Sequence, residues 1–209
     1  MAGRASGGGT AWQWSRTAET RQTLLDAARE VFGEHGYAEA SVAEVVRRAQ
    51  SSVGSLYHHF GGKAELYLAL WEEHQGVLER SATAAVSGAR ARGEEDPLAL
   101  LIAGARAYLE ASWQQRDLVR LFMNDDGPPG FDLLRRTRGR EWVRQNAVLL
   151  GAGADPVDRL TVSVITAIIG EAGREIAACA GKRKAAAITE AAVGLIRKLD
   201  PLTGAAAKP

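Results

Sequence analysis

Apolar residues recur every three or four positions along most of the chain, the spacing that places them on one face of a helix. We therefore predict an all-α protein. The pattern divides the chain into a glycine-rich N-terminal arm over 1–16, a group of short helices over 17–62, a longer helical body over 63–200 and a tail over 201–209.

The residues from 17 to 49 predict a supporting helix followed by the first helix of a helix-turn-helix. The supporting helix is expected from Thr17 to Glu34, with an apolar stripe of Leu24, Leu25, Ala28, Val31 and Phe32. The next helix begins at Ser41, which forms with Glu44 the pattern of a capping box. Its apolar positions are Val42, Val45, Val46 and Ala49.

A turn at Gln50-Ser51 separates that helix from a second one, which we predict to pack through Val53, Leu56 and Phe60. Polar and small residues remain on its other side, namely Gly54, Ser55, Tyr57 and His58. Gly61-Gly62 ends the helix, because glycine readily takes the left-handed conformation that closes a helical C-terminus.

The body contains further amphipathic segments. Helices are predicted from Lys63 to about Ala91, from Pro97 past Trp113, over 117–123, over 131–150, from Pro156 to about Ala180 and over 184–199. Asp96-Pro97 and Asp155-Pro156 are start signals, because an acidic N-cap residue precedes a proline whose missing N–H costs nothing there. The segment NDDGPPG over 124–130 predicts a loop.

The arm over 1–16 has several glycines and no apolar period, so we expect it to be flexible. Arg4 and Arg16 could reach DNA phosphates, as arms of other helix-turn-helix proteins do. Trp12 and Trp14 are unusual in such a segment. They would either dock on the first helix or stay exposed for a partner, and the sequence does not decide between these alternatives.

Composition favours a globular protein of the cytoplasm. The chain has 209 residues, of which 46% are hydrophobic, enough to bury a core. The longest uncharged apolar run, from Leu160 to Gly170, is far short of the ~20 residues that span a bilayer. The single cysteine, Cys179, excludes an internal disulfide framework.

Charge gives no nucleic-acid signal. The net charge is +1, and Met1 to Lys63 holds seven basic and six acidic residues. If this region binds DNA, contact with phosphates must depend on the placement of individual side chains, and affinity should depend only weakly on salt.

At these residues the chain resembles the tetracycline-repressor (TetR) family of bacterial transcription regulators. The resemblance rests on FGEHGY at the end of the supporting helix, on the capping box at Ser41 and above all on SLYHHFGGKAEL from Ser55 to Leu66. It covers roughly the first third of the chain. Gln50-Ser51 stands where family members usually have Gly-Val, so glutamine must adopt a backbone conformation that favours glycine.

The resemblance implies a regulator, most often a repressor, that binds a palindromic double-stranded operator as a homodimer and is released by a small apolar effector. It implies base contacts from the start of each helix and phosphate contacts around them. The implied DNA-binding residues are Ser41, Val42, Ala43, Ser52, Val53, Gly54, Ser55, Tyr57, His58, His59 and Lys63. His59 could instead pack against the supporting helix.

The body would then hold the effector and the dimer interface. Aromatic and apolar residues with two polar anchors suggest a pocket of Tyr108, Trp113, Phe122, Met123, Phe131, Trp142, Glu171 and Arg174. Ordinary core packing of the aromatic residues, with Glu171 and Arg174 paired to each other or across the dimer, is an alternative of at least equal weight for any single residue. The resemblance implies a two-fold bundle of the last two helices through Leu160, Val164, Ile168, Ala172, Ile188, Ala192, Leu195 and Ile196.

Two other function classes remain open at this point. The unusual turn and the neutral charge suggest an interaction module whose helix-turn-helix does not read DNA, and a helical pocket could serve a small enzyme. No catalytic or phosphate-binding motif supports an enzyme. We expect no metal and no cofactor, because His58 and His59 diverge by about 100° on a helix and have no partner at ligand spacing.

Overall fold

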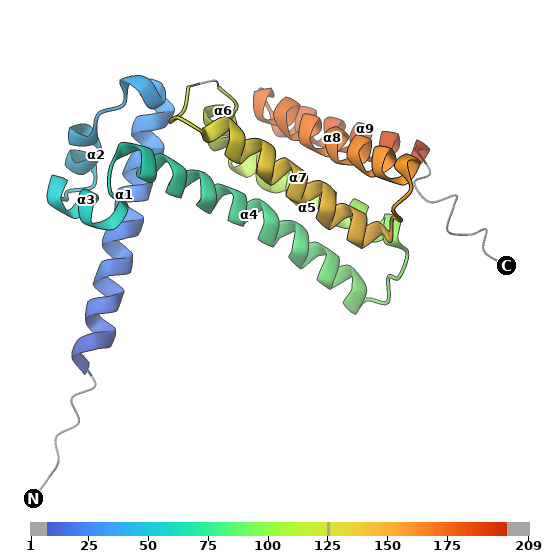
Figure 1. Ribbon diagram of the computed structural model, residues 1–209, viewed down its shortest axis with the longest axis horizontal. Helices are drawn as coiled ribbons and strands as arrows, with labels where there is room; N and C mark the ends of the chain where they lie inside the picture. The colour runs from blue at the N-terminus through green and yellow to red at the C-terminus, as the bar shows by residue number, and fades with distance from the viewer. Residues whose placement is uncertain (1–7, 125, 200–209) are drawn as a thin grey trace, which may run out of the picture. The chain divides into compact units, whose positions relative to one another are not determined.

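The computed structural model describes residues 8–124 and 126–199, and all regular elements within these ranges are helices (Figure 1). The all-α prediction is therefore confirmed. The helices are α1 (Gly8–Glu39), α2 (Val42–Arg48), α3 (Val53–Phe60), α4 (Lys63–Ala91), α5 (Pro97–Gln114), α6 (Arg116–Met123), α7 (Phe131–Leu150), α8 (Pro156–Ala178) and α9 (Lys182–Lys198).

The chain divides into two compact units. The N-terminal unit comprises the described residues up to Glu72 together with Asp126–Pro128, and the C-terminal unit comprises the other described residues. The division falls inside α4 rather than at its start. Its first turns belong to the N-terminal unit, because Leu66, Tyr67 and Leu70 are buried there and the ring of Tyr67 packs edge-on against that of Phe32 at 5.2 Å.

The N-terminal unit is built on the apolar stripe of α1, against which α2 and α3 pack. Leu24, Ala28 and Val31 are fully buried, as the helical period predicts. The helix is longer than predicted at both ends and changes direction at Gly36, whose φ of 73° and ψ of 179° are not helical. Only glycine adopts such angles without strain, so α1 continues after Gly36 as a separate turn.

The expected flexible arm is helical from Gly8 onward, since no proline interrupts the stretch that leads into Thr17. Residues 1–7 lie outside the described residues, and so do the side chains of Trp12, Trp14 and Arg16. Arg4 and the tail over 201–209 lie outside them as well, so the alternatives for the two tryptophans stay open.

In the C-terminal unit, α8 packs against α5, α6, α7 and α9, and α8 and α9 lie side by side (Figure 1). One core cluster joins four of these helices through Leu101, Ile102, Leu150, Val162, Ile165, Val193 and Ile196. Both predicted start signals are confirmed. The Asp96 carboxylate accepts from the N–H of Ala99 at 2.9 Å, and that of Asp155 accepts from Val157 at 2.7 Å.

Candidate nucleic-acid interface

The turn between α2 and α3 is closed by glutamine in the left-handed region. Gln50 has a φ of 48°, and it is the one non-glycine residue with positive φ in the described part of the chain. The Ser51 N–H donates to the carbonyl of Val46 at 2.9 Å, which holds the turn against the end of α2. The predicted turn is confirmed, with the modest steric cost that glutamine has in this conformation.

Helix α3 is fixed at both ends. The Ser52 hydroxyl accepts from the Ser55 N–H at 3.1 Å, and Gly61, at φ 92°, donates its N–H to Tyr57 at 2.9 Å. Leu56 is fully buried and anchors the middle of the helix. The prediction that Val53 packs inward is wrong, because it follows directly after the N-cap, and 47% of its surface is exposed.

The predicted capping box at the start of α2 does not form. Ser41 is the N-cap residue, but its side chain makes no capping hydrogen bond. The Glu44 carboxylate turns away to two arginines: it accepts from Nε of Arg47 at 2.9 Å and from Nε of Arg48 at 2.8 Å. A carboxylate bonded to two guanidinium groups gains more than one bonded to a single uncharged backbone N–H, so Glu44 binds the arginines instead of the N-cap.

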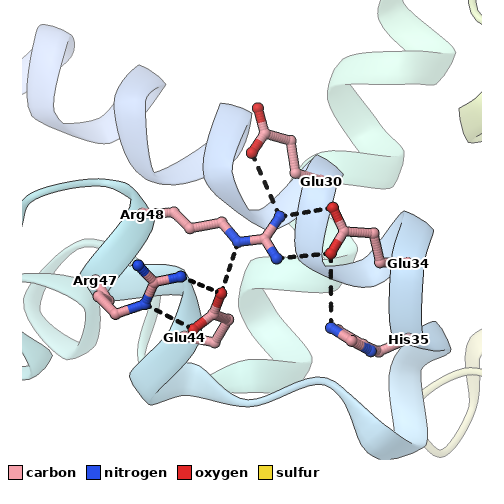
Figure 2. A network of polar contacts seen from close by, with 6 residues as sticks. All are labelled: Glu30, Glu34, His35, Glu44, Arg47 and Arg48. Atoms are coloured by element: carbon pink, nitrogen blue, oxygen red, sulfur yellow. Dashed lines mark hydrogen bonds and ion pairs between the residues drawn. The ribbon is translucent and has the colours of Figure 1, made fainter.

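Figure 2 shows the network that results, which joins α2 to α1. The Arg48 guanidinium forms a two-bond fork with Glu34, at 2.7 and 2.6 Å, and lies 3.5 Å from Glu30. Hydrogen bonds from Arg47 and then Arg48 lower the pKa of Glu44 to about 2, and the bond from Arg48 lowers the pKa of Glu34. The two arginines of the helix-turn-helix therefore have carboxylate partners inside their own unit.

The predicted DNA-binding residues form the outer surface of α2 and α3. The exposed ones are Ser41, Ala43, Ser52, Val53, Gly54, Tyr57 and His58, and the half-buried ones are Val42, Ser55, His59 and Lys63. The side chains near the start of α3 are small, and the hydroxyl of Tyr57 stands on a ring that is 53% exposed. This surface fits contact with thymine methyl groups and single phosphates.

Two of these residues also have partners within the N-terminal unit. The Lys63 ammonium donates to the carbonyl of Ala38 at 2.8 Å and lies 4.8 Å from the ring centre of Tyr37. His59 is half-buried, and burial, then the neighbouring charges of His58 and Arg21, lower its pKa. His59 therefore favours its neutral form more than an exposed histidine does.

Sequence reasoning missed residues that hold the interface from behind. The Arg21 guanidinium lies 5.1 Å from the ring centre of Phe60, and Glu34 binds Arg48. The i, i+4 spacing of Glu30 and Glu34 places two carboxylates on one face of α1, which suggests a basic partner. The spacing alone does not identify that partner as Arg48. Asp126 lies 88 residues from its partner Ala38, and no local pattern could reveal that contact.

In the C-terminal unit, the residues predicted for the pocket fall into two aromatic groups. Tyr108 meets Trp142 edge-on at 5.5 Å, and Phe122 lies between Phe131 at 6.0 Å and His74 at 5.6 Å. His74 is buried and hydrogen-bonds Gln115, a polar pair that the prediction missed because His74 stands at an apolar position of α4. Burial raises the pKa of the Tyr108 hydroxyl.

Of the remaining predicted pocket residues, three are exposed, and Trp113 is half-buried against a core cluster that contains Leu109 and Ile176. Arg174 and Glu171 form an ion pair with each other, and their side chains are about half exposed. This is one of the pairings that the core-packing alternative proposed. Met123 is exposed, and Trp113 stacks under the guanidinium of Arg116 at 4.6 Å. The charges of the two predicted polar anchors, Glu171 and Arg174, are therefore already paired with each other.

The residues predicted for the dimer interface divide by exposure. Leu160, Val164 and Leu195 are exposed, and Ile168 and Ile188 are half-buried. Ala172, Ala192 and Ile196 are buried in the chain's own core and cannot contact a partner. The helical period places these three buried residues on the inner faces of α8 and α9. The predicted interface left out other exposed apolar residues, namely Val157 on α8, Ala187 and Ala191 on α9, and Leu199 at the end of α9.

Comparison with known proteins identifies the N-terminal unit first. Residues 24–70 match the model of the bacterial regulatory proteins of the tetR family. The transcriptional repressor AcnR of Corynebacterium efficiens is 44% identical over 54 residues, which are 26% of this chain and 29% of AcnR. The chain thus spans less than a third of that relative, within the length of the helix-turn-helix region.

A second relative matches over a longer range. The transcriptional activator FasR of Mycolicibacterium smegmatis is 32% identical over an alignment of 160 residues, covering 67% of this chain and 70% of FasR. The chain belongs to the TetR family. An alignment of this length extends beyond the N-terminal unit, so the similarity includes part of the helical body.

Solved structures of TetR-family proteins share the fold. A regulator from Pectobacterium atrosepticum is 28% identical, with a TM-score of 0.52, and the match covers 93% of this chain and 98% of that one. TetR-family proteins are DNA-binding transcription regulators and are not enzymes. As a member of the family, this chain is a DNA-binding transcription regulator. Both the enzyme and the module that does not read DNA are therefore set aside.

Two absences hold for the described part of this TetR-family chain. Within residues 8–124 and 126–199, no histidine, cysteine, aspartate and glutamate side chains gather as a group that could hold a metal ion. Among the helices of the same ranges, none combines the length and the apolar character required to cross a membrane.

Proposed function

We propose that this TetR-family regulator binds a palindromic operator as a homodimer, and that a small apolar effector in the C-terminal unit releases it. The observation that carries the proposal is the apolar surface of α8 and α9. Val157, Leu160 and Leu195 are 68%, 64% and 51% exposed, and exposed apolar residues aligned on paired helices favour association.

The second copy is the natural occupant of this surface. Ala187, Ala191 and Leu195 on α9 and the C-cap residue Leu199 follow one another at four-residue intervals and are all exposed, so they form one stripe along the helix and its end. Alanines in the stripe allow close approach of a partner helix, and the leucines supply apolar area. A two-fold dimer would place two copies of α3 at a fixed separation, as successive major grooves about 34 Å apart require.

Base reading belongs to the start of α3 in this proposal. Ser52, Val53, Gly54 and Ser55 present small side chains that fit close to base edges, where the valine methyls can contact thymine. Tyr57, His58 and Lys63 would hold phosphates around them. Lys63 can donate to a phosphate while it binds Ala38, because an ammonium carries three N–H groups.

The effector site is proposed among the two aromatic groups of the C-terminal unit. Tyr108, Phe122 and Trp142 supply apolar and aromatic surface, and the buried His74 with the half-buried Gln115 supplies polar groups. Such a combination suits a small, mainly apolar molecule with one hydrogen-bonding group. Release from DNA requires that this molecule bind the DNA-free conformation more tightly.

We propose repression as the direction of regulation. AcnR is named a repressor and FasR an activator, so relatives of both kinds exist. Repression needs only occupancy of a promoter, whereas activation needs a further contact with the transcription machinery. Transcription in vitro from a promoter that overlaps the operator should fall when the protein is added, and an increase would show activation.

Selection of duplexes from a random DNA pool by the purified protein tests the proposal. We expect enrichment of an inverted repeat whose half-sites lie about one helical turn apart. Enrichment of an unrepeated site would contradict the dimer, and no enrichment at low salt would contradict sequence-specific binding. The selected duplex then serves to screen small molecules for release, with thermal stabilisation by mass action as an independent signal of binding.

A further inference from the structure

Asp126 binds the end of α1 although it comes from the loop between α6 and α7. Its two carboxylate oxygens accept from the N–H of Ala38 at 3.0 and 3.1 Å. The Tyr67 hydroxyl donates to the carbonyl of Asp126 at 3.3 Å, and Pro128 in the same short segment is buried. Asp126–Pro128 is thus a built part of the N-terminal unit.

The end of α1 is shaped to receive this carboxylate. A Cβ atom on Gly36 would lie 2.4 Å from Oδ2 of Asp126, so only glycine leaves room for it, and only glycine tolerates the φ of 73° there. The next peptide group is held as well, because the carbonyl of Ala38 accepts from Lys63. Asp126 and Lys63 therefore fix both sides of one residue, Ala38, in the last turn of α1 and four residues before α2 begins.

The chain connects the two units by more than α4. Residues on both sides of Asp126–Pro128 belong to the C-terminal unit, on α6 and α7, so the chain enters and leaves the N-terminal unit within three residues. The segment is therefore tethered at both of its ends to the C-terminal unit. Its hydrogen bond to Ala38 holds the last turn of α1, which leads into α2.

We propose that Asp126 is a positioning residue that couples the helices around the effector site to the helix-turn-helix. Its regulatory meaning rests on the proposed function, since a coupling matters for regulation only if the C-terminal unit binds an effector. The contact itself does not depend on that function. An effector that draws α6 away would release Ala38, and DNA binding would in turn favour the conformation in which Asp126 is bound, because coupling is reciprocal.

A mutant cycle in the free protein tests the coupling without DNA or effector. Leu121→Ala loosens α6, where Leu121 is buried, and Asp126→Ala removes the carboxylate. Amide hydrogen exchange at Ala38, read by NMR, is compared in wild type, both single variants and the double variant. We expect Asp126→Ala to speed exchange about tenfold, as loss of a charge-assisted hydrogen bond does, and Asp126→Asn to have a smaller effect.

The cycle separates coupling from general loosening. We expect Leu121→Ala to speed exchange at Ala38 when Asp126 is present and to add nothing when it is absent. Additional speeding in the double variant, or no effect of Asp126→Ala, would overturn the proposal. Asp132→Asn is the matched control, because Asp132 is an exposed acid at the start of α7 that binds Arg135, and it should leave Ala38 unchanged.

Measuring the affinity of each variant for a selected DNA duplex tests whether Asp126 also affects DNA binding. Asp126→Ala should change affinity about threefold to tenfold, whereas Asp132→Asn should not. Equal affinity of both variants and wild type would overturn the role in DNA binding. If wild type selects no duplex, the proposed function fails by itself, while the exchange cycle still decides whether Asp126 couples the two parts of the chain.

Discussion

The two units of this TetR-family chain present opposite surfaces. In the N-terminal unit, the arginines of α2 are bound by Glu34 and Glu44, and the exposed side chains at the start of α3 are small and uncharged. In the C-terminal unit, apolar side chains such as Leu160 and Leu195 are left exposed on the last two helices. The surface of α2 and α3 carries little unpaired charge, and the surface of α8 and α9 is apolar and favours association.

This difference indicates where binding free energy comes from. A DNA-reading surface with few free cations gains little from counterion release, so one copy should bind DNA weakly. Two copies held together bind with an avidity that can exceed either affinity by about 10²–10⁴. In the proposed dimer, association through α8 and α9 would compensate for the weak DNA affinity of the neutral surface of α2 and α3.

The largest effect is expected from a charge on the apolar surface. Leu195→Glu places a carboxylate in the proposed interface, where its burial would be costly, so the dimer should dissociate and operator affinity should fall about 100-fold or more. Sedimentation and DNA titration measure the two changes. Val148→Glu is the control, because Val148 on α7 is 83% exposed but lies off α8 and α9. Equal effects of both substitutions would contradict this interface.

The next effect is on stability rather than on affinity, is confined to the N-terminal unit, and is expected from a substitution in the core of its helix-turn-helix. Leu56 is fully buried, and Leu56→Ala should lower the free energy of unfolding of the N-terminal unit by about 2–5 kcal/mol. Denaturant titration followed by amide exchange in each unit measures it. A uniform loss of protection across α8 and α9 would mean that the two units unfold together.

Tyr57→Phe should weaken DNA binding about tenfold, because it removes one hydroxyl that can donate to a charged phosphate oxygen. Since phosphates carry no sequence information, selected and random duplexes should lose affinity equally. Fluorescence anisotropy with both duplexes gives the comparison. A loss restricted to the selected duplex would assign Tyr57 to base reading instead.

The smallest effect concerns pH. The folded pKa of Glu44, about 2, lies below its ordinary value of 4.5, so its bonds to Arg47 and Arg48 stabilise the fold above pH 4.5. This contribution is lost as the pH falls from 4.5 toward 2. Glu44→Gln should flatten the pH dependence of N-terminal unfolding in that window. An unchanged profile would show that the network adds no net stability, as for many exposed ion pairs.

Local patterns predicted the helices because each depends on residues close in sequence. The apolar period, the caps at Asp96 and Asp155 and the left-handed Gln50 are all local, and all were found. The capping box failed because Glu44 had a stronger partner in its own helix and the sequence does not rank such competitors.

Long-range contacts could not be predicted in this way. Asp126 and Ala38 are joined only by the folded chain, and Ile196 differs from Leu195 only in the side of α9 that it occupies. Hydrophobic residues on two faces of a helix do not show which face meets the chain's own core. The candidate DNA-binding residues could be named as a set because the family motif fixes their order and spacing, and their contact with DNA stays a prediction.

The most direct test of the account is binding of the wild-type protein to the selected duplex and to one isolated half-site of it, over a range of salt. The account predicts that the half-site binds at least about 100-fold more weakly and that both affinities depend only weakly on salt. A half-site bound as tightly as the full duplex, or a steep dependence on salt, would contradict the claim that pairing rather than charge supplies the affinity.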